Sequence, residues 1–353
     1  MNRTRALLVL IVILLLAGPL IIHVPSPEIL LPAEKVAEPF KGFRLTNTVL
    51  ATWLTMSVLA LLSWGATRNL KLVPGRLQNL LEMAVEALWN FVESVAGRHN
   101  GRRFFPLIAT IFLFIVISAW LALLPGFATI GGVKSADEVV HEVKVEAQKD
   151  NKTPNLESAK MLVFNGTGAA VVIPPRGSKE DKEITAAEYE KHGAPAGKTA
   201  GSLVPFLRSA NTDLNTTLAM ALIAMFMVEF WGIRTAGFFK YARRFVNVRQ
   251  LMRGNIMWGL IDAFVGALEG VGEIARVISF TFRLFGNMFA GEILLLVIVS
   301  LLPFVVVLPF VALEIFVGFV QALVFAGLTL VFATMAVASH GDHDESPEHA
   351  AGH

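Results

Sequence analysis

The residues of this sequence that could do chemistry are a few charged and amide side chains inside long apolar segments. One stretch carries Arg283, Asn287 and Glu292, and the last apolar segment carries Glu314 and Gln321. An arginine is permanently protonated, and placing it at the centre of a bilayer costs at least ~2.5 kcal/mol. It therefore needs a partner, a water-filled cavity or a task, unless it reaches an interface or pairs with a carboxylate in its own helix bundle.

Helical geometry divides these polar groups between faces. At ~100° per residue, Asn287 lies about 40° from Arg283 on the same face, whereas Glu292 lies about 180° away. Glu314 and Gln321 are seven residues apart and share a face of their own helix. Because a buried carboxyl group can exchange protons with water in a half-open channel, this set indicates a proton path. A hydrogen bond between Glu292 and Glu314 that holds two helices together is the structural alternative, and it is compatible with the first reading.

The composition is typical of an integral membrane protein. Of 353 residues, 54% are hydrophobic and 16% are charged. There is no cysteine, which excludes disulfides, thiol catalysis and cysteine metal sites. The net charge is only +2, and no basic patch with interleaved aromatic residues indicates nucleic-acid binding.

We therefore expect an all-α integral membrane protein with five or six membrane helices, a cytoplasmic amphipathic helix and a long tilted final helix pair. Residues 1–24 combine two arginines with a short apolar run and fit either a cleaved signal peptide or a signal anchor. Residues 25–126 hold the first spans. Within them, apolar residues recur at helical spacing over 77–97, a segment too polar to cross a membrane.

The middle of the chain differs from the rest in composition. Residues 127–207 form an extramembrane insertion, long enough for a small domain. Its apolar runs Met161–Phe164 and Ala169–Ile173 predict a strand pair that turns at Asn165-Gly166. Residues 208–339 contain the channel-forming spans.

Basic residues set the orientation. They follow the spans that end near Gly65 and Gly232, so the positive-inside rule puts the amphipathic helix in the cytoplasm and the insertion outside. The tail, residues 340–353, mixes histidines with acidic residues and reads as a solvated cytoplasmic end or as a weak metal site. Elsewhere no histidines have metal-ligand spacing, and we expect no bound metal and no cofactor.

The stretch Arg283-Leu-Phe-Gly-Asn-Met-Phe-Ala-Gly-Glu292 resembles the signature of subunit a of the F-type ATP synthase. Three further stretches fit the same family: Phe105-Pro106-Leu107 with Leu123-Leu124-Pro125, Asp213-Leu-Asn-Thr-Thr-Leu-Ala-Met-Ala-Leu222, and Val320-Gln-Ala-Leu-Val-Phe. The resemblance covers the chain from about Thr46 to Ser339.

The resemblance implies a subunit that lies beside a ring of c subunits and forms two aqueous half-channels leading to the ring. Arg283 would face the ring, attract each arriving carboxylate in its ionised form, and block a proton from passing straight between the channels. Proton flow would drive rotary ATP synthesis elsewhere in the complex. The chain itself would catalyse no reaction, and it lacks a GxxxxGK[ST] nucleotide loop.

By the same match, Asn287 and Gln321 would shape the ring-facing surface, and Glu292 and Glu314 would relay protons in the outer half-channel. Some family members have a histidine where this chain has Glu314, so the relay here would be all-carboxyl. Weaker candidates for channel lining are Ser279, Glu269, Asp213 and Ser118.

The implied partners are the c-subunit ring, the peripheral-stalk b subunits, other ATP synthase subunits and the lipid bilayer, with no nucleic acid. The implied location is multi-pass in a bacterial inner membrane. The alternative function is a secondary transporter with an intramembrane Arg/Glu site for its substrate or for protons. Such proteins often contain internal repeats, and no clear repeat is found in this sequence.

Overall fold

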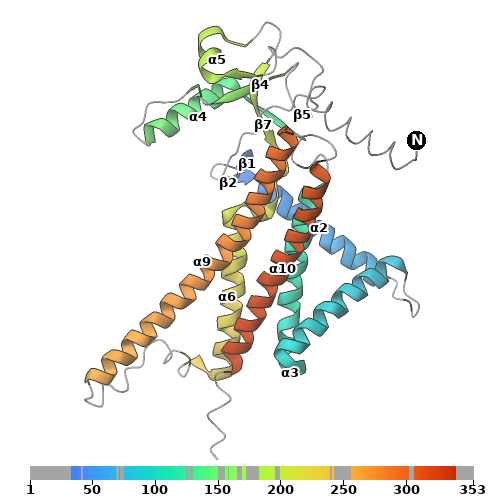
Figure 1. Ribbon diagram of the computed structural model, residues 1–353, viewed down its shortest axis with the longest axis vertical. Helices are drawn as coiled ribbons and strands as arrows, with labels where there is room; N and C mark the ends of the chain where they lie inside the picture. Colours follow the sequence, from blue (N-terminus) through green and yellow to red (C-terminus); the bar gives the residue numbers. More distant parts are fainter. Residues whose placement is uncertain are drawn as a thin grey trace, which may run out of the picture. The chain divides into compact units, whose positions relative to one another are not determined.

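The computed structural model (Figure 1) describes residues 33–40, 43–68, 71, 75–124, 127, 130–149, 156–157, 159–164, 169–171, 183–194, 199–238, 241, 256–301 and 306–338. Within these residues, five helices are long and apolar enough to cross a membrane: Asn47–Thr67, Gln78–Ala122, Leu214–Ala236, Ala263–Val299 and Val307–Ala338. The expected all-α integral membrane protein is confirmed. The predicted signal segment (1–24) and the tail (340–353) lie outside the described residues.

The membrane helices follow the apolar segments of the sequence. Their bounds are α2 Asn47–Thr67, α3 Arg76–Ala122, α6 Leu214–Ala236, α9 Ile256–Leu301 and α10 Val307–Ala338. In a bilayer only a helix or a closed barrel satisfies all backbone hydrogen bonds, so apolar runs of this length become helical. No proline interrupts α9, which is one continuous helix and ends two residues before Pro303.

The amphipathic segment expected at 77–97 is the first half of α3, which turns back sharply at Gly97. Gly97 has φ +70°, a value that favours glycine. The rings of Trp89 and Phe105 lie 5.4 Å apart, centroid to centroid. A straight helix would separate these two residues by about 24 Å along its axis, so the two halves of α3 form a hairpin.

By its contacts the chain forms two compact units. One comprises Met1–Thr55, Ser118–Asp213 and Met288–Val317; the other comprises Met56–Ile117, Leu214–Asn287 and Gly318–His353. In the second unit, edge-to-face and tilted contacts between aromatic rings join the helices. These pairs are Phe104–Trp231 between α3 and α6, Phe112–Phe319 between α3 and α10, and Phe280–Phe325 between α9 and α10, with centroids 4.5, 5.6 and 4.8 Å apart. Close packing of this kind associates helices in lipid.

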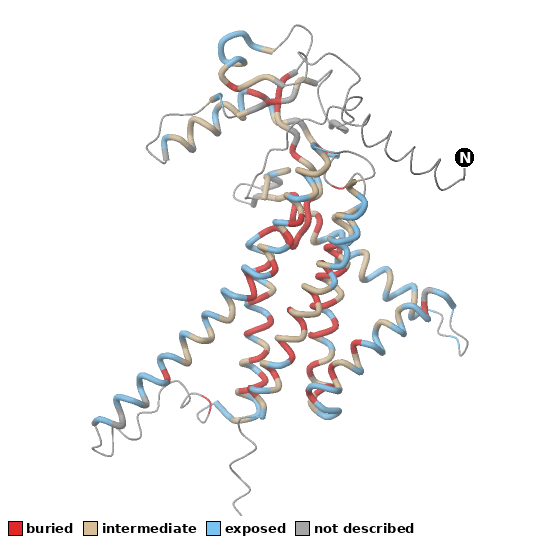
Figure 2. The backbone as a smooth tube through the Cα atoms, in the orientation of Figure 1, coloured by how far each residue is buried: buried red, intermediate tan, exposed pale blue. Residues whose placement is uncertain are grey.

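The same contacts decide which face of α9 points inward. Phe280 and Leu284 are buried against the second unit, whereas Phe264, Ile278 and Phe282 are exposed. Figure 2 shows that much of the first half of α9 is exposed. This part of α9 therefore presents a large apolar face to lipid or to another protein.

In the first unit the insertion folds around a five-stranded antiparallel sheet with the order β5-β3-β7-β4-β6. Its strands are β3 Ile130–Ser135, β4 Lys160–Phe164, β5 Ala169–Val171, β6 Glu183–Thr185 and β7 Thr199–Pro205. The two predicted strands exist as β4 and β5, but the predicted pairing between them is wrong. β5 pairs with β3, while β4 lies between β7 and β6. The Asn165-Gly166 pair favours a turn only between residues that are close in sequence. The position of β4 is instead decided by its pairing with β7, which forms hydrogen bonds to a strand on each side.

Two helices share a small core with this sheet. α4 (Ala136–Lys149) and α5 (Ala186–His192) bury Ala136 and Ala186 with Met161 of β4 and Ala200 of β7. The Tyr189 hydroxyl of α5 donates a hydrogen bond to Asp137 Oδ1 of α4 at 3.1 Å, and burial together with this bond raises the pKa of that hydroxyl. A second sheet pairs β1 (Lys35–Phe40) with β2 (Phe43–Thr46), immediately before α2.

A close approach of backbones in the insertion offers a matched test of the sheet. A Cβ on Gly131 would lie 2.0 Å from the carbonyl oxygen of Val204, whereas a Cβ on Gly132 would lie 3.7 Å from the Phe206 ring. We expect Gly131→Ala to separate β3 from β7 and to speed proteolysis of the insertion about tenfold. Gly132→Ala should stay within about twofold of the parent. Equal cleavage rates for the two variants would contradict the register between β3 and β7.

Candidate functional site

Arg283 lies on an exposed face of α9. Ser279, Arg283 and Asn287 follow each other at intervals of four residues, and all three are exposed. The Arg283 guanidinium donates from Nη2 to Ser279 Oγ at 3.4 Å, and its Cζ atom lies 5.9 Å from the centre of the Phe280 ring. No carboxylate among the described residues forms an ion pair with Arg283. The cation is therefore presented outward from this chain and is not neutralised within its described part.

Gln321 and Glu269, two other residues predicted from the sequence, lie in the same unit. Gln321 is half-buried on α10, and Glu269 is half-buried on α9, fourteen residues before Arg283. Glu269 has interaction partners of its own. No hydrogen bond in the described part of the chain links either residue to Arg283.

Glu292, in the first unit, forms a buried ion pair with Arg208. The Arg208 Nε atom lies 3.1 Å from Glu292 Oε1, and Nη2 lies 3.3 Å from Oε2. Only 8% of the Arg208 side chain is exposed, and its guanidinium Cζ lies 5.9 Å from the Phe289 ring centre. Two parallel N–H···O contacts between a guanidinium and a carboxylate are both strong and specific in direction. The arginine thus fixes the orientation of the Glu292 carboxylate.

Sequence reasoning did not single out Arg208. It lies three residues after the end of β7 and two residues before the short 3₁₀ helix η2, Ala210–Thr212. A signal was nevertheless available. The positive-inside rule predicts that this segment lies on the outer side, where arginines are less common than on the cytoplasmic side. An arginine predicted there, beside a span that carries a carboxyl group, indicates a buried acidic partner.

Glu314 packs on the backbone of α9 next to Glu292. A Cβ built on Gly291 would lie 2.1–2.3 Å from the carboxyl atoms of Glu314. In the described part of the chain, however, the two carboxyl groups are not hydrogen-bonded to each other, because Glu292 is held by Arg208. The structure thus brings together two of the predicted relay groups and adds an arginine to them.

Glycine at position 291 is needed for this arrangement, which leads to a prediction. Gly291→Ala should push the Glu314 carboxyl group away from α9 and, on the function that the sequence resemblance implies, lower ATP-driven proton pumping by about tenfold. Gly272→Ala is the matched control, because no atom lies within 4 Å of a Cβ at that position of the same helix. Pumping should be measured per assembled complex in membrane vesicles. Equal pumping by both variants would show that the position of Glu314 is unimportant.

Asp213 and Ser118, the weaker outer candidates, are both buried in the first unit. Thr48, in the first turn of α2, donates a hydrogen bond from Oγ1 to Asp213 Oδ2 at 2.6 Å. Next to it, the Nδ2 and Oδ1 atoms of Asn47 are buried and have no hydrogen-bond partner among the described residues. Buried amide groups of this kind are commonly satisfied by internal water. The start of α2 therefore adds polar groups to the surroundings of Asp213.

Comparisons with known proteins identify the family of the chain. Residues 49–334 match the model of the family described as ATP synthase A chain. ATP synthase subunit a of Geotalea uraniireducens is 29% identical over 286 residues, which are 81% of this chain and 85% of that protein. ATP synthase subunit a 3 of Pelobacter propionicus is 28% identical over the same shares. The Gloeobacter violaceus subunit a is 28% identical over 84% of this chain and 86% of its own length.

The family match begins inside the first candidate membrane helix and ends inside the last one, and it includes the Arg283 stretch, the Glu292 site and the whole insertion. The sequence resemblance, the membrane helices and these relatives lead to one conclusion. The chain is a multi-pass membrane protein that belongs to the ATP synthase A chain family.

Proposed function

We propose that this chain is the ion-translocating subunit a of an F-type ATP synthase in a bacterial inner membrane. One observation carries the proposal: α9 exposes Arg283 within an apolar helix, with no ion-pairing carboxylate among the described residues. Exposing a permanent cation to hydrocarbon is costly, so this face must be covered by a partner that supplies negative charge within the membrane. A c-subunit ring with one membrane carboxylate per subunit is such a partner.

Arg283 would act on each ring carboxylate that passes it. An opposite charge within ~4–6 Å favours the ionised form of a carboxyl group, so the arginine promotes release of the proton carried by the ring. The same fixed positive charge repels a proton that would cross directly between two half-channels. Asn287 lies one turn away on the exposed face and adds polar contacts at the ring, and Gln321 on α10 is proposed to do the same.

The outer half-channel would be formed by the polar groups of the first unit. Glu292 and Glu314 are the proton-exchanging carboxyl groups, and Arg208 orients Glu292. The buried groups around Asp213 favour internal water there, and they include the amide of Asn47, which has no hydrogen-bond partner among the described residues. On the cytoplasmic side, Ser279 hydrogen-bonds Arg283 and would line the inner half-channel together with Glu269.

In this role the chain catalyses no chemical reaction. Each proton that crosses a potential of 100 mV releases ~2.3 kcal/mol, so several protons are needed for each ATP made elsewhere in the complex. The chain's contribution is to keep the two half-channels separate and to bring each proton to the ring. The peripheral-stalk b subunits would hold it against the torque of the turning ring.

The absence of cysteine permits a direct test of the ring contact. We expect Asn287→Cys to form a disulfide, under mild oxidation, with a cysteine placed beside the membrane carboxylate of the c subunit. Phe226→Cys is the matched control, because Phe226 is 68% exposed on α6, another membrane helix. Cross-linking from position 226 but not from 287 would place the ring on the wrong face and would overturn the proposal.

Purification distinguishes the proposed function from that of a secondary transporter. Subunit a should leave the membrane in mild detergent together with a c ring and a peripheral stalk. A transporter should instead purify alone and carry its substrate in liposomes. Transport activity by the isolated chain, without a ring, would contradict the proposed function.

A further inference from the structure

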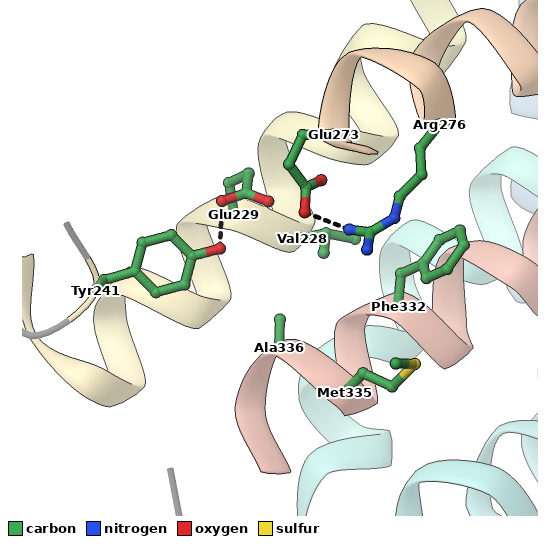
Figure 3. Close-up of a pocket in the computed structure, with 8 residues that line it drawn as sticks. All are labelled: Val228, Glu229, Tyr241, Glu273, Arg276, Phe332, Met335 and Ala336. Carbon is green, nitrogen blue, oxygen red and sulfur yellow. Dashed lines mark hydrogen bonds and ion pairs between the residues drawn. The ribbon is translucent and has the colours of Figure 1, made fainter. Parts of the chain in front are cut away.

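A small pocket in the second unit is lined by charged groups that the proposed path does not use. It lies among α6, α9, α10 and Tyr241, and its volume is about 20 Å³ (Figure 3). Its wall contains Glu229 of α6, Glu273 and Arg276 of α9, and the hydroxyl of Tyr241. This volume is enough for one water molecule, which requires about 10–15 Å³. The pocket is thus a polar site of the size of a water molecule within a group of apolar helices.

Backbone geometry brings Tyr241 back over the end of α6. Gly237 has φ +83° and follows the last residue of α6, which lets the chain reverse direction. The Tyr241 ring then covers Gly232, where a Cβ would lie 2.8 Å from the ring. The Tyr241 hydroxyl donates a hydrogen bond to Glu229 Oε2, as Figure 3 shows. Tyr241 is buried, so it closes one side of the pocket and fixes the Glu229 carboxyl group.

On the facing helix, Glu273 uses only one of its two carboxyl oxygens. Arg276 binds Oε1, and the Arg276 guanidinium Cζ lies 4.8 Å from the Phe332 ring centre on α10. The other oxygen, Oε2, is buried and accepts no hydrogen bond from any described residue. A buried acceptor without a donor costs roughly 1–3 kcal/mol. A water molecule in the adjacent pocket would supply the missing donor.

We propose that this pocket holds one water molecule through which protons pass between Glu229 and Glu273, on the cytoplasmic side of the inner half-channel. The inference rests on the proposed function, because only a proton-translocating chain needs such a relay. Glu229 lies near the end of α6 that leads into the basic, cytoplasmic segment. Glu273 lies on α9 between that segment and Ser279, which hydrogen-bonds Arg283. The two carboxyl groups therefore extend the path from Arg283 toward the cytoplasm.

The proposed step moves one proton from Glu273 to Glu229 through the water molecule. The protonated carboxyl group of Glu273 breaks its O–H bond and gives the proton to the water oxygen. The same water releases one of its other protons to the Glu229 carboxylate, and a new O–H bond forms there. Glu273 ends ionised beside Arg276, Glu229 ends neutral, and the water is unchanged. Reversal of these steps carries a proton inward from the cytoplasm to the ring.

The competing explanation is that these groups only hold the helices together. Arg276 does join Glu273 to Phe332, and Tyr241 does join Glu229 to Gly232. A purely structural role predicts less assembled complex and unchanged pumping per complex. A relay predicts normal assembly and slower pumping.

The experiment uses the complete ATP synthase in inverted membrane vesicles. Glu229→Gln and Glu273→Gln are made singly and together, with Glu86→Gln, an exposed residue in the first half of α3, as the control. ATP-driven proton pumping is measured per assembled complex. We expect the double variant to fall about tenfold or more, and the control to match the parent. Tyr241→Phe, which keeps the ring over Gly232 but removes the hydroxyl, should lower pumping about threefold.

Chemical rescue tests the proton-transfer role itself. Glu273→Ala enlarges the pocket, and added formate should restore part of its pumping, because a small weak acid can replace the missing carboxyl group. Restoration would support the relay. Pumping at the control level in the double glutamine variant would overturn it, as would a loss in Glu273→Ala that formate does not restore.

Arg283→Ala measured in parallel distinguishes the two proposals. If Arg283→Ala abolishes pumping and the glutamine variants pump normally, the relay is wrong and the proposed function stands. If Arg283→Ala pumps normally, the proposed function fails, whatever the pocket variants show.

Discussion

Replacing Arg283 with alanine is expected to reduce ATP-driven proton pumping by about 100-fold or more, while the complex still assembles. The reason is electrostatic: without the fixed cation, no group on this face of α9 favours the ionised form of an arriving ring carboxylate. Because Arg283 is exposed and forms no ion pair among the described residues, its removal leaves no unpaired buried charge there. Pumping should be measured in inverted vesicles, with assembly checked by the amount of co-purified c ring.

Two controls make this result specific. Arg98→Ala removes an exposed arginine next to the turn at Gly97 in α3, and this variant should pump at the parental level. Leu284→Ala would be a poor control despite its neighbouring position, because Leu284 is only 1% exposed and its truncation costs about 2–5 kcal/mol of packing. The passive proton leak should also rise in Arg283→Ala if the arginine separates two half-channels. Normal pumping in Arg283→Ala would mean that Arg283 does not act on the ring carboxylates.

Replacing Arg208 with methionine is expected to have the largest effect on stability. It keeps a long apolar side chain but leaves the Glu292 carboxylate without its arginine. Removing one partner of a buried ion pair costs about 3–5 kcal/mol, and the partial exposure of Glu292, 24%, favours the lower end. We expect a loss of assembled complex on heating, measured as the fraction of subunit a still associated with the ring.

A double variant separates stability from proton transfer at the same pair. Arg208→Met combined with Glu292→Leu replaces both charges by apolar groups, which should restore most of the assembly lost in Arg208→Met alone. Pumping should remain low, because the proposed relay then lacks the Glu292 carboxyl group. If the double variant assembles and pumps normally, Glu292 is not a relay group and the pair is only a structural link.

Several properties of this protein could be predicted from the sequence because they depend on local periodicity. Long apolar runs predicted the membrane helices, and α2, α6 and α10 follow those runs closely. The same periodicity placed Arg283 and Asn287 on one face of α9, and both are exposed there. A helix has a fixed number of residues per turn, so residue spacing alone determines which side chains share a face.

The tertiary structure decided which distant residues meet. Arg208 and Glu292 are 84 residues apart, and their ion pair depends on how the end of the insertion packs against α9. The sheet order of the insertion likewise depends on β7, which pairs with β3 and β4 over long sequence separations. The Tyr241–Glu229 contact requires the reversal of the chain at Gly237. Such contacts are selected by burial and hydrogen bonding summed over the whole fold, and no local pattern of residues encodes that sum.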